Sequence, residues 1–167
     1  MNKRYFSGIG SRETPQDVLD KFFKIGAYLA KKGYVLRSGG ADSADSAFES
    51  GCDSENGAKE IYLPWRGFNN NNSELYNIPI GAFLIAKSIH PVWGDLKQGS
   101  QKLHARNIGQ LISYDFDTPS DFVVCWTKNG EAKGGSATVI NLAKELGVPV
   151  FNYGSDGEER LREYCKG

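Results

Sequence analysis

Glycine clusters follow three of the strands that the sequence predicts, and each cluster precedes a predicted helix. They occupy residues 8–12 (GIGSR), 38–42 (SGGAD) and 133–136 (KGGS). Because glycine has no side chain, its backbone N–H can approach an anion closely, and the N-terminus of the next helix adds about half a positive charge. The adjacent cations Arg12 and Lys133 add charged donors. These types and spacings point to phosphate or nucleotide binding.

Packing alone explains many single glycines after strands, so it is the number of clusters that favours binding. The dinucleotide fingerprint GxGxxG and the P-loop GxxxxGK[ST] are both absent from the sequence. An ordinary NAD-dependent dehydrogenase or P-loop ATPase is therefore not supported, and no cofactor or metal ion is expected.

Charged and amide side chains near the second cluster and in the middle of the chain are further candidates. Asp42 and Asp45 start the helix after the second cluster, where they either complement the helix dipole or bind a ribose hydroxyl or a base edge. Arg106 and Asn107 share one helical turn and either reach a phosphate or base or belong to a solvated helix face.

Two tryptophans, Trp65 and Trp126, follow predicted strands at the same edge of the sheet. They either stack on a base or pack at the rim. The two histidines of the chain support no Ser/His/Asp catalytic arrangement, and no catalytic residue is expected. The complete set of predicted ligand-binding residues is Gly8, Gly10, Ser11, Arg12, Ser38, Gly39, Gly40, Ala41, Asp42, Asp45, Trp65, Arg106, Asn107, Trp126, Lys133, Gly134, Gly135, Ser136 and Thr138.

Alternating strands and helices must position these residues. Thr14 is expected to cap the first helix, with Pro15 at its first position and Gly33 after its end. The predicted strands cover residues 5–9, 34–36, 59–63, 122–126 and 148–151, and the predicted helices lie between and after them. The pattern predicts one α/β domain of Rossmann-like type over residues 1–167, mainly a parallel sheet with helices on both faces. An insertion is expected at about residues 65–115.

Composition narrows the class of protein. The chain has 167 residues with 20 Lys+Arg and 20 Asp+Glu, so its formal net charge is zero, which argues against a general polyanion binder. Three separated cysteines and two histidines support neither a disulfide framework nor a zinc site. No signal peptide and no apolar run of about 18 residues is evident. We expect a cytoplasmic protein with no membrane segment.

The net charge of zero arises because a basic stretch and an acidic stretch of the chain cancel each other. Residues 1–37 carry eight basic and three acidic side chains, and residues 38–65 carry one basic and six acidic side chains. Cations thus accompany the first glycine cluster and carboxylates surround the second. Such a distribution suits a small ligand with phosphates at one end and hydroxyls at the other better than a long uniform polyanion.

The glycine clusters, together with residues 61–65 (IYLPW) and 104–107 (HARN), resemble the SLOG superfamily. That superfamily includes the Rossmann-like domain of the DNA-processing protein DprA (Smf), the LOG phosphoribohydrolases and nucleotide-sensor domains. The resemblance covers roughly residues 4–152 and is strongest to small DprA-like proteins encoded by phages. It implies nucleotide-related ligands and frequent homo-oligomers, for which residues 65–100 are a candidate surface.

Two departures from the SLOG pattern affect the expected function. Ser43 stands where the family's GADGAD-like run has glycine, and Ser136 and Ala137 replace a Thr-Gly pair. Asn141 stands where LOG hydrolases carry the glutamate required for cleavage, and an amide is no general acid or base near neutral pH.

The resemblance therefore implies a non-catalytic protein that senses or sequesters a small nucleotide-derived signal, such as a cyclic ADP-ribose-like molecule. DprA-like binding of single-stranded DNA is the first alternative. A LOG-like nucleoside monophosphate phosphoribohydrolase is the second.

Overall fold

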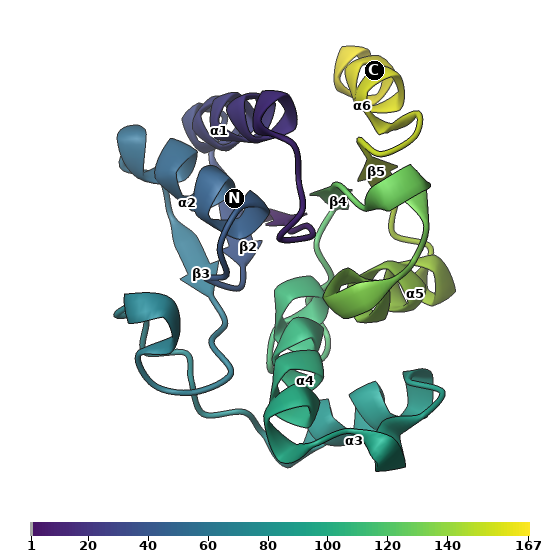
Figure 1. Ribbon diagram of the computed structural model, residues 1–167. Coiled ribbons are helices and arrows are strands. Elements are labelled where there is room, and N and C mark those ends of the chain that lie inside the picture. The colour runs from purple at the N-terminus through teal and green to yellow at the C-terminus, as the bar shows by residue number, and fades with distance from the viewer. Residues whose placement is uncertain (1) are drawn as a thin grey trace.

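Five parallel strands form one sheet in the computed structural model, which describes residues 2–167 (Figure 1). The strand order is β3-β2-β1-β4-β5, as in Rossmann-like folds. The strands are β1 (Arg4–Gly8), β2 (Tyr34–Ser38), β3 (Lys59–Ile61), β4 (Phe122–Cys125) and β5 (Val150–Asn152). The α/β class, the parallel sheet and the Rossmann-like architecture predicted from the sequence are confirmed.

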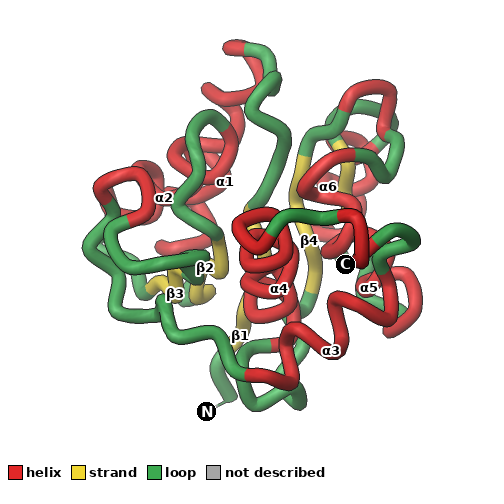
Figure 2. Tube along the Cα trace, turned by 60° about the horizontal axis from the view of Figure 1, so that its bottom comes forward, coloured by secondary structure: helices red, strands yellow, loops and turns green. Residues whose placement is uncertain are grey.

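Helices cover both faces of the sheet. The first layer comprises α1 (Gln16–Lys31), α2 (Ala44–Ser54) and α6 (Gly157–Lys166), and the second comprises α3 (Ile80–Ile89), α4 (Gln98–Ile112) and α5 (Ala137–Leu146). Figure 1 shows the layers on opposite sides of the strands, and Figure 2 shows α4 in front of the sheet. Each layer encloses its own hydrophobic core.

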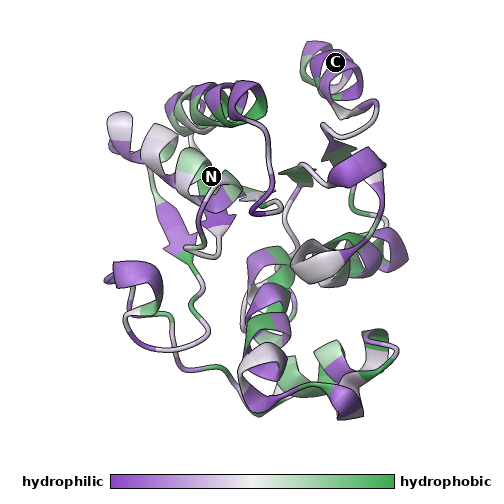
Figure 3. Cartoon of the chain, in the orientation of Figure 1, coloured by the Kyte–Doolittle hydropathy of each residue, from purple (hydrophilic) through white to green (hydrophobic). Residues whose placement is uncertain are grey.

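Alternate residues of β4 face the two cores. Phe122 and Val124 pack beneath the first layer, whereas Val123 and Cys125 pack beneath the second, and all four are buried. Figure 3 accordingly shows β4 as hydrophobic and most of the edge strand β3 as hydrophilic. A central parallel strand is buried on both faces, so its sequence is continuously apolar.

The start of α1 differs from the sequence prediction by one residue. The helix begins at Gln16 with the extended Pro15 in the N-cap position, and no side chain caps it. The Thr14 hydroxyl instead donates to the Ser11 carbonyl oxygen (2.5 Å), which commits it to the preceding turn. The predicted N-cap role of Thr14 is therefore wrong, while Gly33 does follow the helix with a φ of 87°.

The segment between β3 and β4, where an insertion was expected, contains α3 and α4. Helix α4 contributes much of the second core, and α3 packs against α4 through Ala82 and Ala86. No helix within residues 2–167 is long and apolar enough to cross a membrane.

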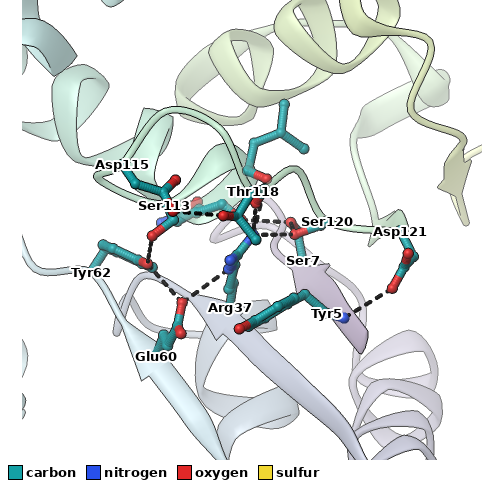
Figure 4. Close-up of polar contacts among 12 residues, drawn as sticks. Tyr5, Ser7, Arg37, Glu60, Tyr62, Ser113, Asp115, Thr118, Ser120 and Asp121 are labelled. Carbon is teal, nitrogen blue, oxygen red and sulfur yellow. Dashed lines mark hydrogen bonds and ion pairs between the residues drawn. The ribbon is translucent and has the colours of Figure 1, made fainter. Parts of the chain in front are cut away.

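A buried polar network holds the end of α4 against the sheet (Figure 4). Arg37 on β2 is 1% exposed, and its Nε donates to Glu60 Oε1 (3.0 Å). Its Nη1 donates to the carbonyl oxygens of Leu111, in the last turn of α4, and of Thr118, in the loop that follows α4. The Ser7 hydroxyl on β1 donates to the carbonyl oxygen of Gln110 (2.6 Å). These bonds fix the position of α4 relative to β1 and β2.

Helices α1 and α2 approach so closely that a methyl group does not fit between them. A Cβ added to Gly51 would lie 2.0 Å from the carbonyl oxygen of Phe23. We expect Gly51→Ala to lower the free energy of unfolding by about 1–3 kcal/mol, as overpacking does, in urea denaturation. Gly99→Ala in α4 is the matched control, because open space surrounds Gly99. A loss of stability equal in both variants would contradict the packing argument.

Candidate functional site

A cleft of about 810 Å³ lies at the carboxyl ends of the strands. It is lined by the turns after β1 and β4, by the start of α2 and by one face of α4. The strand order reverses between β1 and β4, and ligands of open α/β sheets bind at such a point. The cleft volume lies within the ordinary range of small-molecule sites.

Eleven of the 19 predicted residues line this cleft. They come from all three glycine clusters and from α4: Gly10, Ser11, Arg12, Ala41, Asp45, Arg106, Asn107, Lys133, Gly134, Gly135 and Ser136. The fold thus brings residues more than 120 positions apart in sequence to one cavity.

The glycines of the first two clusters serve packing. A Cβ on Gly8 would lie 2.6 Å from the Phe48 ring, and one on Gly10 would lie 2.5 Å from Ala44 Cβ. Gly40 has a φ of 70°, and a Cβ there would collide with the Leu63 side chain. Both the left-handed backbone conformation and the lack of room for a side chain therefore require glycine at this position.

The third cluster differs from the first two. No atom lies within 4 Å of a Cβ built on Gly134 or Gly135, so packing does not require glycine at these positions. Both glycines are exposed, and they line the cleft. Their backbone is therefore accessible to a ligand.

Polar side chains from two helices form the floor of the cleft around Gly39. Arg106 is 6% exposed, and its Nη1 donates to the carbonyl oxygens of Gly39 (2.6 Å) and Tyr62 (3.0 Å). Its Nε donates to Asn107 Oδ1 (2.7 Å), and the Asn107 amide donates to the carbonyl oxygen of Gly135 (2.7 Å). These bonds link the second and third glycine clusters through α4.

Asp45 is a buried carboxylate on this floor. It is 4% exposed, and its Oδ2 accepts the backbone N–H of Ala41 (3.2 Å). Burial raises the pKa of Asp45 to about 6, although the Arg106 guanidinium and the Ala41 amide oppose the increase. Burial also lowers the pKa of Arg106, against the attraction of Asp45. The two charges compensate each other only in part.

Exposed charges surround the opening of the cleft. Arg12 and Lys128 are exposed and form no ion pair within residues 2–167. The Lys133 ammonium contacts the Glu131 carboxylate at 2.6 Å, which raises the pKa of Lys133. Arg12 and Lys128 are therefore the cations most available to a ligand at the rim.

Eight predicted residues do not line the cleft: Gly8, Ser38, Gly39, Gly40, Asp42, Trp65, Trp126 and Thr138. Ser38 is buried and donates to the Gly8 carbonyl oxygen (2.6 Å), while Asp42 accepts the Asn69 amide (2.9 Å). Trp65 packs edge-on against Phe68.

Trp126 and Thr138 also face away from the cleft. Trp126 packs partly against the first core. Thr138 bonds to His104 Nδ1 (2.7 Å) beside a second, smaller pocket of about 430 Å³. Asn141 lines that second pocket and not the cleft.

Several lining residues escaped the sequence analysis: Ile9, Glu13, Leu103, Gln110, Thr127, Lys128, Asn129 and Glu131. Gln110 is the most informative, because its residue is only 2% exposed. The spacing of Leu103, Arg106, Asn107 and Gln110 places them on one face of α4. Extending the Arg106–Asn107 pair by one helical turn would have found Gln110.

Ser43 occupies the position where the SLOG pattern has glycine, and its backbone conformation explains why glycine is favoured there. Its φ is 68° and its ψ is −111°, a conformation that strains residues other than glycine. The Ser43 hydroxyl donates to the Arg12 carbonyl oxygen (2.8 Å). This bond ties the second turn to the first and offsets part of the strain.

Comparison with known proteins identifies the fold of the chain but no family. No protein-family model and no curated protein matches the chain. Solved structures do match it, and at 17–22% identity they show a shared Rossmann-like α/β fold.

The described chain within residues 2–167 contains no group of three or more His, Cys, Asp or Glu side chains that could hold a metal ion.

Three of the similar structures are particular proteins. The molybdenum cofactor (Moco) carrier protein of Chlamydomonas reinhardtii is 18% identical, with a TM-score of 0.56 over 95% of this chain and 80% of that one. DNA processing protein A from Helicobacter pylori, described as binding single-stranded DNA, is 22% identical, with a TM-score of 0.56 over 98% and 74%. The structural-genomics target TM1055 is 22% identical, with a TM-score of 0.53 over 89% and 72%.

Proposed function

We propose that this protein is a SLOG-type, non-catalytic binder of a small nucleotide or nucleotide-derived signal, such as a cyclic ADP-ribose-like molecule. One observation carries the proposal: buried polar side chains on α2 and α4 face a cleft where the three glycine clusters meet. Within residues 2–167 the Tyr114 hydroxyl is the one fully buried polar side-chain atom without a hydrogen-bond partner, so the unpaired atoms of these side chains are reached from the cleft, where a bound ligand supplies partners for them. The similarity to a Moco carrier protein supports the holding of a small ligand without chemical change.

The charge around the cleft suits a small ligand. Its lining includes the cations Arg12, Arg106, Lys128 and Lys133 together with the carboxylates Glu13, Asp45 and Glu131. A groove that follows a nucleic-acid backbone is more uniformly positive. A nucleotide needs cations only at its phosphate end.

The absence of a glutamate at Asn141 supports binding over hydrolysis. Asn141 carries an amide where the resemblance places the carboxylate of LOG hydrolases, and it lines the second pocket and not the cleft, so this position supplies no carboxylate to the cleft. The signal is then sensed or sequestered by the protein and is not turned over. A homo-oligomer in the cytoplasm of a phage-infected cell is the setting that the resemblance favours.

Calorimetry with a panel of nucleoside mono-, di- and cyclic phosphates tests the proposal. We expect at least one ligand to bind in the micromolar range or tighter and to raise the unfolding temperature. Arg12→Ala should weaken binding about tenfold, while Lys144→Ala, an exposed lysine on α5 outside the cleft, should leave it unchanged. Absence of heat and of a thermal shift with every nucleotide would reject the proposal.

Binding of single-stranded DNA is the second candidate, and the similarity to the DNA processing protein A favours it. It predicts a shift of labelled oligonucleotide that weakens steeply with salt and is lost in Arg12→Ala. No shift at about 50 mM salt would remove it. Release of free base from a nucleoside monophosphate would instead support the phosphoribohydrolase alternative.

A further inference from the structure

Three side chains of different hydrogen-bonding character meet on the floor of the cleft. Asp45 on α2 provides acceptors, Arg106 on α4 provides donors, and Gln110 one turn later provides both. All three are at least 94% buried and line the same cavity. Gly39 is their common neighbour, since a Cβ there would lie 2.1 Å from Gln110 Nε2 and 2.9 Å from the Arg106 guanidinium carbon.

These groups retain unused hydrogen-bonding capacity toward the cleft. Within residues 2–167 no protein group bonds to the Gln110 side-chain amide or to Arg106 Nη2, whereas Arg106 Nε and Nη1 are bonded. The Tyr114 hydroxyl is the one fully buried polar side-chain atom there without a partner, so the free groups of Gln110 and Arg106 are reached from the cleft. Asp45 forms no ion pair with a described residue within 4.0 Å. Its carboxylate accepts the backbone N–H groups of Ala41 and Gly39, which leaves lone pairs for a ligand. A ligand group that inserts here meets acceptors, donors and an amide together.

The combination selects against an anion on the floor. A phosphate would gain from Arg106 but would face the buried Asp45 carboxylate, and like charges in a buried site repel strongly. A neutral group with two adjacent N–H donors and a carbonyl acceptor matches all three side chains. The donors fit the carboxylate as a bidentate pair, and the carbonyl accepts from Arg106 or Gln110.

The 2-amino-4-oxopyrimidine edge has this arrangement, and guanine and pterins share it. Adenine lacks it, because its ring nitrogen at the corresponding position is an acceptor that would face Asp45. Ile9 and Leu103 supply apolar surface in the same cavity, against which a flat ring packs. The exposed cations Arg12 and Lys128 at the rim are then left for phosphates.

We infer that the floor of the cleft recognises the 2-amino-4-oxopyrimidine edge of a guanine nucleotide or a pterin, with Asp45 on its N–H groups and Arg106 and Gln110 on its carbonyl. The inference rests on the proposed function for its site. It replaces the adenine-containing example of cyclic ADP-ribose with a ligand that has a guanine-type edge, and it adds the direction in which the ligand lies. The base is inward and the phosphate outward.

Calorimetry with GMP, XMP, IMP, AMP, guanosine and the unphosphorylated pterin neopterin tests this recognition. GMP should bind at least tenfold more tightly than AMP, within the 10- to 100-fold range typical of a good bidentate contact. IMP, which lacks the 2-amino group, should lie between them. Comparison of guanosine with neopterin separates the two sources of the edge: the tighter of the two identifies the ring system.

Asp45→Asn gives a reciprocal test. Asparagine replaces one acceptor oxygen with a donor, so GMP should lose affinity while XMP, which has a 2-oxo group, should gain it. Gln110→Leu should weaken GMP about tenfold and leave the rim contacts in place. Asp53→Asn, the same substitution on an exposed residue of α2 outside the cleft, should change neither ligand.

The outcomes separate this inference from the proposed function. Equal binding of AMP and GMP, or an equal loss of every ligand in Asp45→Asn, would overturn the inference and leave nucleotide binding intact. Binding of neopterin alone, with the same dependence on Asp45, would support the inference and reject a nucleotide as the ligand. If no ligand of the panel binds, both are rejected.

Discussion

Asp45→Asn is expected to stabilise the ligand-free protein at pH 8 by about 1–3 kcal/mol, although it removes a group that we place in the binding site. The carboxylate is 4% exposed, and burial raises its pKa from 3.8 to about 6. Folding at pH 8 therefore requires a charge to be buried at a net cost. Asparagine keeps the shape and the acceptor for the Ala41 N–H without the charge.

The sign follows from proton linkage. Because the folded pKa of Asp45 is the higher one, the folded state binds more protons than the unfolded state between pH 3.8 and about 6. The contribution of Asp45 to stability is fully present below the unfolded value and is lost as the pH rises through the folded value. Each pKa unit corresponds to about 1.4 kcal/mol, which sets the upper limit near 3 kcal/mol.

Urea denaturation of wild type and Asp45→Asn at pH 4 and pH 8 measures this difference. The two free energies of unfolding should be similar at pH 4, should diverge between pH 4 and about 6, and should differ by a nearly constant amount at higher pH. The charges that act on Asp45 are Arg106 on α4 and Glu49 on α2. Glu145→Gln on α5 removes an exposed carboxylate that carries no burial cost and forms no ion pair within residues 2–167, so it should show no such divergence. A difference between wild type and Asp45→Asn that does not depend on pH would contradict the burial cost.

The fold was predictable because its patterns are local. The continuous apolar run of β4, buried on both faces, and the helix end at Gly33 are set by neighbouring residues, and both predictions agree with the structure. The start of α1 was misplaced, because whether the Thr14 hydroxyl bonds forward or backward depends on the Ser11 turn. The direction of this hydrogen bond depends on the geometry of the turn, which the periodicity of apolar residues in the sequence does not reveal.

The cleft was predictable in part. The glycine clusters and the adjoining Asp45 were found because strand ends of a parallel sheet meet at one edge. Arg106 was found because it shares a helical turn with Asn107. Trp126 also follows a strand, but its side chain packs toward the first core, away from the cleft. Helical spacing from Arg106 and Asn107 reaches Gln110 one turn later, but whether that face of α4 lines the cleft depends on how α4 lies against β1, which the Ser7 bond fixes. Contacts between elements distant in sequence decide both cases.

Arg106→Met is expected to lower the free energy of unfolding by about 3–5 kcal/mol, because several buried hydrogen bonds from a charged group, each worth about 1.5–3 kcal/mol, are lost. Arg106 is 6% exposed and donates to the carbonyl oxygens of Gly39 and Tyr62 and to Asn107 Oδ1. Methionine fills much of the volume but satisfies none of these acceptors. The pKa of Asp45 should also rise further, since Arg106 is the main group that lowers it.

A double-mutant cycle separates the charge effect from the lost hydrogen bonds. Asp45→Asn combined with Arg106→Met should be less destabilised at pH 8 than Arg106→Met alone, because no uncompensated carboxylate then remains buried. At pH 4 this rescue should shrink, since Asp45 is protonated there. Arg12→Met, at an exposed rim position, should change the free energy of unfolding by less than about 0.5 kcal/mol. Additive effects of Asp45→Asn and Arg106→Met at both pH values would show that the two side chains, although they share the cleft floor, do not interact.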